Sequence, residues 1–233
     1  LGQRTLGFMP DLPHKKHEDL PLYSFFDDDH KQYAEAVRSI RTSLTLLALD
    51  KQLKLIELTS SVPSEGKSTS AVNLAFAFGQ MEKVLIIDAD MRRPTLAKRF
   101  GLPAYQPGLA NLIAGREQLD DCIVVDEKSG VSLLPAGNVP PNPLELLSSP
   151  RFTELLQQLA QRYDRVIIDT PPVQAVSDAL VIAKAADAVL YVVAADQTRG
   201  GAVKSGIHKL LQTENNLYGV ILNKVNMKKV AQS

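Results

Sequence analysis

A run of strand-forming residues passes directly into a loop containing glycine, lysine and serine, and then into a helical pattern. The loop is residues 61–69 (SVPSEGKST); it follows the apolar run at 53–58 and precedes the apolar-periodic run at 71–78. At such a junction the unpaired backbone N–H groups and the helix dipole favour an anion. The arrangement therefore predicts a phosphate-binding loop on a strand–loop–helix unit. An ordinary strand-to-helix turn is the alternative, because Ser61 stands where the motif usually begins with glycine.

The residue types in this loop suit phosphate chemistry. A glycine at position 66 lets the backbone approach a phosphate closely, and Lys67 would reach the β- and γ-phosphate oxygens as a point charge. The Ser68 hydroxyl is a suitable ligand for the Mg²⁺ that bridges those phosphates. The residues expected to bind the nucleotide are Ser64, Glu65, Gly66, Lys67, Ser68 and Thr69.

Two further apolar runs end in carboxylates, at residues 84–90 (VLIIDAD) and 166–169 (VIID). Short continuous apolar runs are typical of parallel strands that are buried on both faces. Because ligands bind beyond the carboxyl ends of such strands, we expect Asp88, Asp90 and Asp169 to converge on the phosphate loop near one Mg²⁺. Taken singly, an acid after a strand is more often a helix cap or a turn residue.

Strand and helix patterns alternate over the rest of the chain. Strands are expected at residues 188–195 and 217–222, and helices at 144–147, 152–163, 178–186 and 201–212. This alternation predicts an α/β fold with a mostly parallel, doubly wound sheet flanked by helices. Asn223, at the end of the last strand, would border the nucleotide, or would form a turn.

Composition argues against several classes of function. The 26 lysines and arginines equal the 26 aspartates and glutamates, so no overall field favours nucleic acid as a partner. Cys122 is the single cysteine, which excludes an intrachain disulfide. The longest uncharged apolar run, residues 188–195, is too short to cross a bilayer. The 233 residues suit one soluble α/β domain with short appendages.

The two ends of the expected domain differ in pattern. Residues 1–30 contain proline, histidine and charge without a sustained period, and are expected to form a linker or extended arm before a domain at residues 31–233. The domain would open with a helix at residues 30–48, whose apolar stripe consists of Tyr33, Val37, Ile40, Leu44 and Leu47. The opposite side would carry Glu35, Arg38 and Arg41, either as a solvated face or as a contact surface.

Together these segments resemble the bacterial tyrosine kinases (BY-kinases), which are P-loop NTPase-like proteins of the deviant-Walker subclass. Residues 61–69 are similar to a deviant Walker A motif, residues 84–94 (VLIIDADMRRP) to the Walker A′ motif and residues 166–172 (VIIDTPP) to Walker B. The resemblance continues through residues 107–115, 134–147 and 219–223, so it covers nearly the whole chain.

The resemblance implies ATP-dependent phosphoryl transfer to tyrosine, with ATP and Mg²⁺ as cofactors. The residues implied to carry out the reaction are Lys67, Asp88, Asp90 and Asp169, and those implied to hold Mg²⁺, partly through water, are Ser68, Asp88 and Asp169. Asp90 would accept the tyrosine proton, or Asp88 if Asp90 binds the metal. Asn223 occupies the position of an asparagine that contacts the purine in related proteins. A partitioning- or scaffold-type ATPase is the alternative function, with water in place of tyrosine.

The resemblance also implies partners and a location. Glu35, Arg38 and Arg41 match the motif through which the family's kinase domains form a ring and phosphorylate one another in trans. Family members regulate capsular and exopolysaccharide synthesis at the cytoplasmic face of the membrane. Their partners are a transmembrane portion of the same or a second protein and a cognate tyrosine phosphatase. The family's tyrosine-rich C-terminal tail is expected to be absent, because no tyrosine follows Tyr218.

Overall fold

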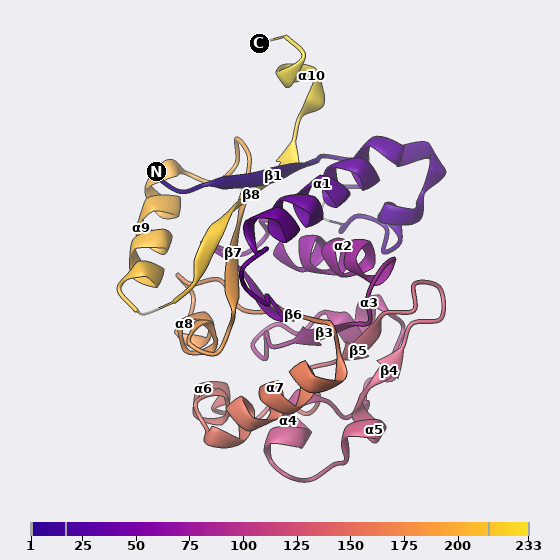
Figure 1. The fold of residues 1–233 in the computed structure, drawn as a ribbon, viewed down its shortest axis with the longest axis vertical. Helices are drawn as coiled ribbons and strands as arrows, with labels where there is room; N and C mark the ends of the chain where they lie inside the picture. Colours follow the sequence, from indigo (N-terminus) through magenta and orange to yellow (C-terminus); the bar gives the residue numbers. More distant parts are fainter. Residues whose placement is uncertain (1, 17, 214, 233) are drawn as a thin grey trace.

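The computed structural model describes residues 2–16, 18–213 and 215–232, which form strands and helices around one sheet (Figure 1). The strands are β1 (Thr5–Pro10), β2 (Leu55–Ser60), β3 (Val84–Asp88), β4 (Val124–Val125), β5 (Ser132–Leu134), β6 (Arg165–Asp169), β7 (Ala188–Ala194) and β8 (Leu217–Val225). The helices are η1 (Ser24–Phe26), η2 (Asp28–His30), α1 (Lys31–Leu47), α2 (Lys67–Gly79), α3 (Leu96–Arg99), α4 (Leu109–Ile113), α5 (Leu119–Cys122), α6 (Pro143–Leu147), α7 (Pro150–Arg162), α8 (Asp178–Ala183), α9 (Gly200–Leu211) and α10 (Met227–Val230).

The sheet has the strand order β1-β8-β7-β2-β6-β3-β5-β4 and is parallel except where β4 pairs with β5. The prediction of a mostly parallel, doubly wound sheet is therefore confirmed. Central β2 lies between β7 and β6, and β6 also pairs with β3. In this register Asp169 lies opposite Leu58 on one side and opposite Asp88 on the other. The carboxyl ends of the three strands that carry the predicted site thus meet at one edge of the sheet.

Helices cover both faces of the sheet, and each face has its own core. On one face Ile56 and Leu58 of β2 pack in a cluster that also contains buried side chains of α1 and α2. On the other face Leu55 and Ile168 belong to a cluster with buried side chains of α7, while β7 and β8 pack in a third cluster with α8 and α9. Because the central strands are buried on both faces, their sequences are continuously apolar, as predicted.

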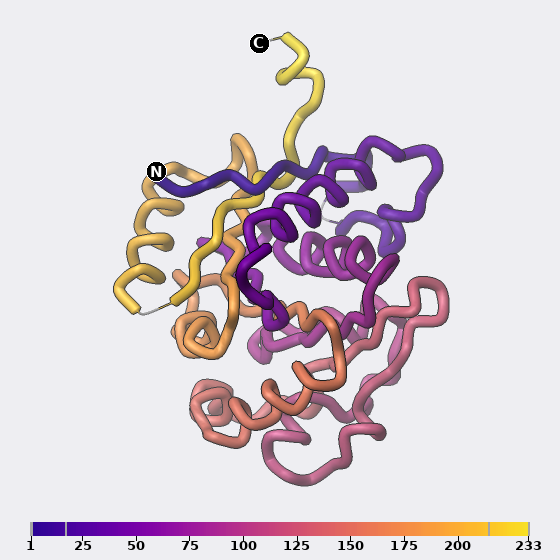
Figure 2. The backbone as a smooth tube through the Cα atoms, in the orientation of Figure 1, coloured from indigo at the N-terminus to yellow at the C-terminus, as the bar shows by residue number. Residues whose placement is uncertain are grey.

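The N-terminal segment, for which the sequence predicted a linker or extended arm, is packed on the domain. Residues 5–10 form β1, which pairs in parallel with β8 at the edge of the sheet. Leu6, Met9 and Phe25 are buried. Figure 2 shows this stretch running beside β8 and then folding back toward α1. Periodicity missed β1 because glycine and proline interrupt it; the edge position accepts Pro10, and a Cβ on Gly7 would lie 2.7 Å from Ile40 Cγ1 of α1.

Helix α1 confirms the predicted apolar stripe except at its last position. Tyr33, Val37, Ile40 and Leu44 are buried, whereas Leu47 is 38% exposed because the helix ends there. On the opposite side of α1, the candidate contact residues form hydrogen bonds and ion pairs within the chain. Glu35 is exposed and pairs with Arg38 at 2.8 Å, and Arg38 Nε donates to Gln80 Oε1 at 3.3 Å.

The guanidinium of Arg41 also donates within the chain, to the backbone carbonyl of Ala77 near the end of α2. All three candidate interface side chains therefore have partners within their own chain. After β8, the chain ends in α10, which projects from the body of the molecule (Figure 1). None of the helices that the structure describes is long and apolar enough to span a bilayer.

Candidate active site

The loop between β2 and α2 has the backbone geometry of a tight anion-binding turn. Ser64 and Gly66 have positive φ angles of 68° and 78°, and α2 begins at the next residue, Lys67. Two features require glycine at position 66. Its left-handed backbone conformation favours glycine, and a Cβ there would lie 2.0 Å from Asn223 Nδ2. The free N–H groups at the start of this 13-residue helix are therefore available to a phosphate.

Glu65 uses its side chain to hold this loop in shape. Its Oε2 accepts from the backbone N–H groups of Ser61 and Val62, at 2.9 and 3.2 Å, and its Oε1 accepts from Ala194 N at 3.1 Å and from the Thr198 hydroxyl. The residue is buried. Although Glu65 was predicted among the nucleotide-binding residues, these contacts make its carboxylate a brace between the loop and the end of β7.

Ser61, the departure from the usual glycine, is also built into the structure. Its hydroxyl lies 2.6 Å from the Tyr191 hydroxyl, and both residues are buried. Burial raises the pKa of Tyr191 to about 12, with a smaller contribution from Glu65 in the same direction. A serine is thus accommodated at the first loop position because β7 supplies a hydrogen-bond partner for it.

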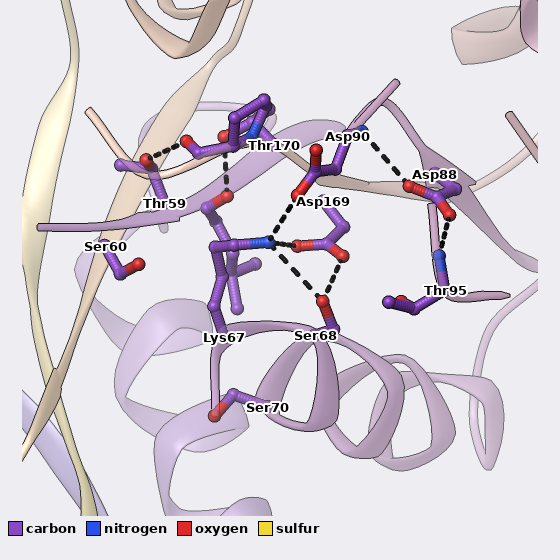
Figure 3. Close-up of polar contacts among 12 residues, drawn as sticks. Thr59, Ser60, Lys67, Ser68, Ser70, Asp88, Asp90, Thr95, Asp169 and Thr170 are labelled. Atoms are coloured by element: carbon purple, nitrogen blue, oxygen red, sulfur yellow. Dashed lines mark hydrogen bonds and ion pairs between the residues drawn. The ribbon is translucent and has the colours of Figure 1, made fainter. Parts of the chain in front are cut away.

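Lys67, Ser68 and Asp169 form one hydrogen-bonded group at the start of α2 (Figure 3). The ammonium of Lys67 forms an ion pair with Asp169 Oδ1, and Ser68 Oγ donates to Asp169 Oδ2 at 2.6 Å. Lys67 Nζ also lies 3.9 Å from Asp90 Oδ2. All three ionisable side chains are largely buried, so their mutual attraction is weakly screened by solvent.

Asp90 lies between the phosphate loop and the turn that follows β3. Its Oδ1 accepts from the backbone N–H groups of Arg92 and Arg93 at 3.2 and 3.0 Å, while Oδ2 faces Lys67. Burial raises the pKa of Asp90, and the nearby Lys67 partly opposes that shift. A carboxylate in this setting is a stronger base than an exposed one.

Asp88 is engaged by the backbone instead. Its Oδ2 accepts from Thr95 N and Leu96 N at 2.9 and 3.1 Å, and its Oδ1 accepts from Asp90 N at 3.1 Å. Burial, followed by the charge of Asp169, raises the pKa of Asp88 to about 7. The three acids do lie together, as predicted, but the contacts of Asp88 shape the turn after β3 and leave little capacity for a ligand.

Lys67, Ser68 and Asp90 line a cavity of about 340 Å³, whereas Asp88 and Asp169 are both absent from its lining. The other walls are formed by the loop residues 62–66, by Thr69, Arg92, Arg93, Thr95 and Arg99, and by Pro171, Pro172, Ala175 and Val176 after β6, with Ser60 and Asp19. A second cavity of about 290 Å³ shares Ser64, Gly66, Thr69 and Asp19 with the first. The two cavities together flank the phosphate loop.

Asn223 lies in the wall of the second cavity, where the sequence placed it near the nucleotide. Its Nδ2 donates to the backbone carbonyl of Glu65 at 2.9 Å, so it also supports the loop. The same wall contains Lys224 and six N-terminal residues, Pro10, Asp11, His14, Glu18, Asp19 and Leu20. The N-terminal contribution was not predicted, because it depends on the pairing of β1 with β8.

The donor set suits Mg²⁺ bound through few protein ligands. Within the described ranges, no three His, Cys, Asp or Glu side chains are arranged to share a metal ion. The adjacent oxygens of Ser68 and Asp169 nevertheless match the usual magnesium arrangement, in which one or two protein oxygens are completed by phosphates and water. Asp88, predicted as a third ligand, has both carboxylate oxygens engaged by backbone amides.

Two arginines of the cavity wall behave differently from one another. Arg92 makes a two-pronged contact with the buried carboxylate of Asp178, at 3.2 and 3.1 Å, and so links the β3 turn to the start of α8. Arg99, which the sequence did not single out, donates from Nη1 to Thr69 Oγ1 at 3.2 Å. The sequence shows that Arg92 and Arg93 follow Asp90, but it does not predict the contact between Arg99 and Thr69, which joins α3 to α2.

Comparison with known proteins places this site in a family. Residues 53–228 match the AAA domain family. The chain is 37% identical over 191 residues to tyrosine-protein kinase YwqD of Bacillus subtilis, covering 82% of this chain and 80% of YwqD. It is 36% identical over 212 residues to tyrosine-protein kinase ptk of Acinetobacter johnsonii, covering 91% of this chain but 29% of that longer protein.

A solved structure agrees with these sequence relatives. The kinase domain of VpsO superposes with a TM-score of 0.78 at 46% identity, covering 86% of this chain and 99% of that domain. The resemblance inferred from the motifs is therefore confirmed: the chain belongs to the AAA domain family and, within it, to the bacterial tyrosine-protein kinases.

Proposed function

We propose that this domain transfers the γ-phosphoryl group of ATP to tyrosine hydroxyls. One observation supports the proposal above all: Lys67, Ser68, Asp90 and Asp169 meet at the start of α2, beside a loop whose backbone is shaped for phosphates. Relatives over most of the chain are named tyrosine-protein kinases. An ordinary strand-to-helix turn would not require a buried lysine among three carboxylates.

In this proposal the cation of Lys67 and the N–H groups of the loop hold the phosphates and neutralise charge in the loose transition state. Ser68 and Asp169 would hold Mg²⁺, which supplies further positive charge to the β- and γ-phosphate oxygens. The tyrosine oxygen forms a bond to the γ-phosphorus as the bond to the leaving ADP oxygen breaks. Asp90 accepts the tyrosine proton, because it lines the cavity with a raised pKa and faces Lys67.

Asp88 has a supporting role in this scheme. Its three backbone contacts fix the turn that carries Asp90, so its effect on the reaction is through the position of that residue. Glu65 and Asn223 similarly hold the phosphate loop through its backbone. The side chains that face the phosphates are then Ser64, Lys67, Ser68 and Thr69.

The wider biological setting is also a proposal. The family resemblance favours a kinase that regulates capsular or exopolysaccharide synthesis at the cytoplasmic face of a membrane, next to a transmembrane portion of the same or a partner protein. A ring of kinase domains in contact through Glu35, Arg38 and Arg41, phosphorylation in trans and reversal by a cognate tyrosine phosphatase belong to this proposal. The carboxylate of Glu35 supports the contact surface, because it is exposed and its ion pair with Arg38 lies on the surface of α1.

The direct test is incubation with Mg-ATP and a tyrosine-containing polymer, followed by phosphopeptide mass spectrometry, with Lys67→Met as the matched control. We expect phosphotyrosine with the parent chain and none with the variant. ADP release without phosphotyrosine would support the scaffold-type ATPase instead. Absence of both products, despite a folded chain, would contradict any catalytic function.

A further inference from the structure

Arg99 ends the short helix α3 and points back to the phosphate loop. Its Nη1 donates to Thr69 Oγ1 at 3.2 Å, in the first turn of α2. Both residues line the cavity that contains Lys67 and Asp90. A guanidinium is therefore present in the wall of the proposed nucleotide site, at the residue that directly follows Lys67 and Ser68.

In the described part of the chain, no carboxylate neutralises the guanidinium of Arg99. Among the described residues, no Asp or Glu oxygen lies within ion-pair distance of Arg99, and its Nη2 is buried without a hydrogen-bond acceptor. Burial lowers the pKa of Arg99, while the more distant Asp19, Asp169 and Tyr33 act in the opposite direction. A buried cationic donor that is left unpaired costs free energy.

Three other arginines of this domain have structural contacts: the partly buried Arg41 donates to the backbone carbonyl of Ala77, and two more pair with carboxylates. Arg92 makes a two-pronged contact with Asp178, and Arg165 makes one with Glu82 at 2.8 and 3.1 Å. Both guanidiniums thus have a carboxylate in the planar arrangement that arginine favours. Among the described residues Arg99 has neither a carboxylate in this arrangement nor an acceptor for Nη2, so its environment suits an anion that enters the cavity.

We propose that Arg99 is a nucleotide-binding residue that, together with Thr69, recognises the phosphate chain of the bound nucleotide. This inference rests on the proposed function. The geometry explains the pairing, because a threonine hydroxyl that accepts from Arg99 keeps its own proton to donate to a phosphate oxygen. The free Nη2 group would donate to the same chain, as arginine commonly does to phosphates.

The test compares MgADP binding by isothermal titration calorimetry for the parent chain, Arg99→Met, Arg99→Lys and Lys98→Met. Lys98 is the matched control, because it is an exposed cation on the same short helix. We expect Arg99→Met to raise the Kd by about tenfold or more, since charged hydrogen bonds to phosphate are lost. Arg99→Lys should retain part of the affinity, and Lys98→Met should stay within about twofold of the parent.

Thermal unfolding without nucleotide separates a binding role from a structural one. If Arg99 binds the nucleotide and does not stabilise the ligand-free fold, Arg99→Met should leave the melting temperature of the ligand-free protein unchanged or raise it. The reason is that an apolar side chain replaces an unpaired buried charge. MgADP affinity equal to that of the parent would overturn the inference. So would a loss of affinity in both Arg99 variants that tracks a fall in ligand-free stability. Failure of the parent itself to bind MgADP would instead overturn the proposed function, and the inference with it.

Discussion

Strands β3 and β6 end in nearly the same sequence, but the acids at their ends have different contacts. Each strand ends in Ile-Ile-Asp, and the two acids, Asp88 and Asp169, lie opposite each other in the sheet. Asp88 accepts three backbone N–H groups, whereas Asp169 accepts from the side chains of Lys67 and Ser68. An acid at the end of a parallel strand therefore lies at the site, but its role depends on which groups donate hydrogen bonds to it.

The residues that follow each strand account for the difference. After β3 the chain turns back, so that the amides of Asp90, Thr95 and Leu96 reach the Asp88 carboxylate. After β6 come Thr170 and two prolines; Thr170 N donates to Leu58 O, and proline has no N–H to give. Asp169 is thus left with oxygens that a cationic or hydroxyl side chain can use.

Replacement of the lysine on the β6 side should have the largest effect. Lys67→Met removes the cation shared by Asp169 and Asp90, so we expect turnover of Mg-ATP to fall by about 1,000-fold or more, because charge in the transition state is no longer neutralised. Steady-state release of ADP measures this, with circular dichroism to verify the fold. Turnover close to that of the parent would contradict the assignment of the phosphate loop.

Removal of the proposed base on the β3 side should come next. Asp90→Asn keeps an acceptor for the amides of Arg92 and Arg93 but loses proton-accepting capacity, so kcat should fall by about 100-fold or more with little change in MgADP affinity. Asp164→Asn is the control, because that exposed acid also accepts a backbone N–H, from Lys83, at the far end of the same strands. Equal, small losses in both variants would show that Asp90 is not the base.

Glu57 is a third acid in the same part of the sheet, and it differs from both Asp88 and Asp169. It lies on β2 opposite Ile168, one residue before Asp169. It is fully buried, and neither carboxylate oxygen has a hydrogen-bond partner in the part of the chain that the structure describes. Burial raises the pKa of Glu57 well above 4.5, despite the opposing effects of Thr170 and Lys67. The folded state therefore holds a proton that the unfolded chain releases, and stability should fall as pH rises from about 4.5 toward the raised pKa.

Glu57→Gln removes this titration while it keeps the shape of the side chain. As pH rises, the unfolding free energy of the parent should fall relative to that of Glu57→Gln, by up to about 1.4 kcal/mol per pH unit. Urea unfolding between about pH 5 and pH 8 measures it. Parallel pH profiles for the two proteins would mean that Glu57 is not protonated in the fold.

The smallest effect is expected far from both strand ends, on α1. Glu35→Ala removes an exposed carboxylate and should weaken self-association while it leaves turnover within about twofold of the parent. Sedimentation velocity at matched concentrations measures self-association, and Glu154→Ala, at an exposed position of α7, is the control. If the parent associates and the variant shows the same distribution of oligomers, Glu35 belongs to a solvated face and not to a contact surface.

Local pattern was sufficient to predict much of this molecule. The glycine-lysine-serine loop, the strands on either side of β2 and the apolar stripe of α1 each follow from residues that are neighbours in sequence. The convergence of Asp88, Asp90 and Asp169 also followed, because parallel strands bring their carboxyl ends to one edge. These are features in which local preference and the tertiary fold agree.

The remaining features depend on contacts between distant segments. β1 was missed because its partner, β8, lies at the other end of the chain. The brace formed by Glu65 requires β7, and the contact of Arg99 with Thr69 requires that α3 fold back onto α2. The role of Asp88 depends on which backbone amides reach it, and that is a property of the folded turn rather than of residue type.

The comparison between the two strand ends is tested most directly by Asp169→Asn and Asp88→Asn, measured together for phosphotyrosine formation at a temperature where both are folded. Asp169→Asn removes the charge that faces Lys67 and Ser68, and should reduce the rate by about 100-fold or more. Asp88→Asn keeps one acceptor for the turn and should reduce the rate by about tenfold, while it lowers the unfolding free energy by about 1–3 kcal/mol. Equal loss of rate in the two variants, or a greater loss for Asp88→Asn without loss of stability, would contradict the account.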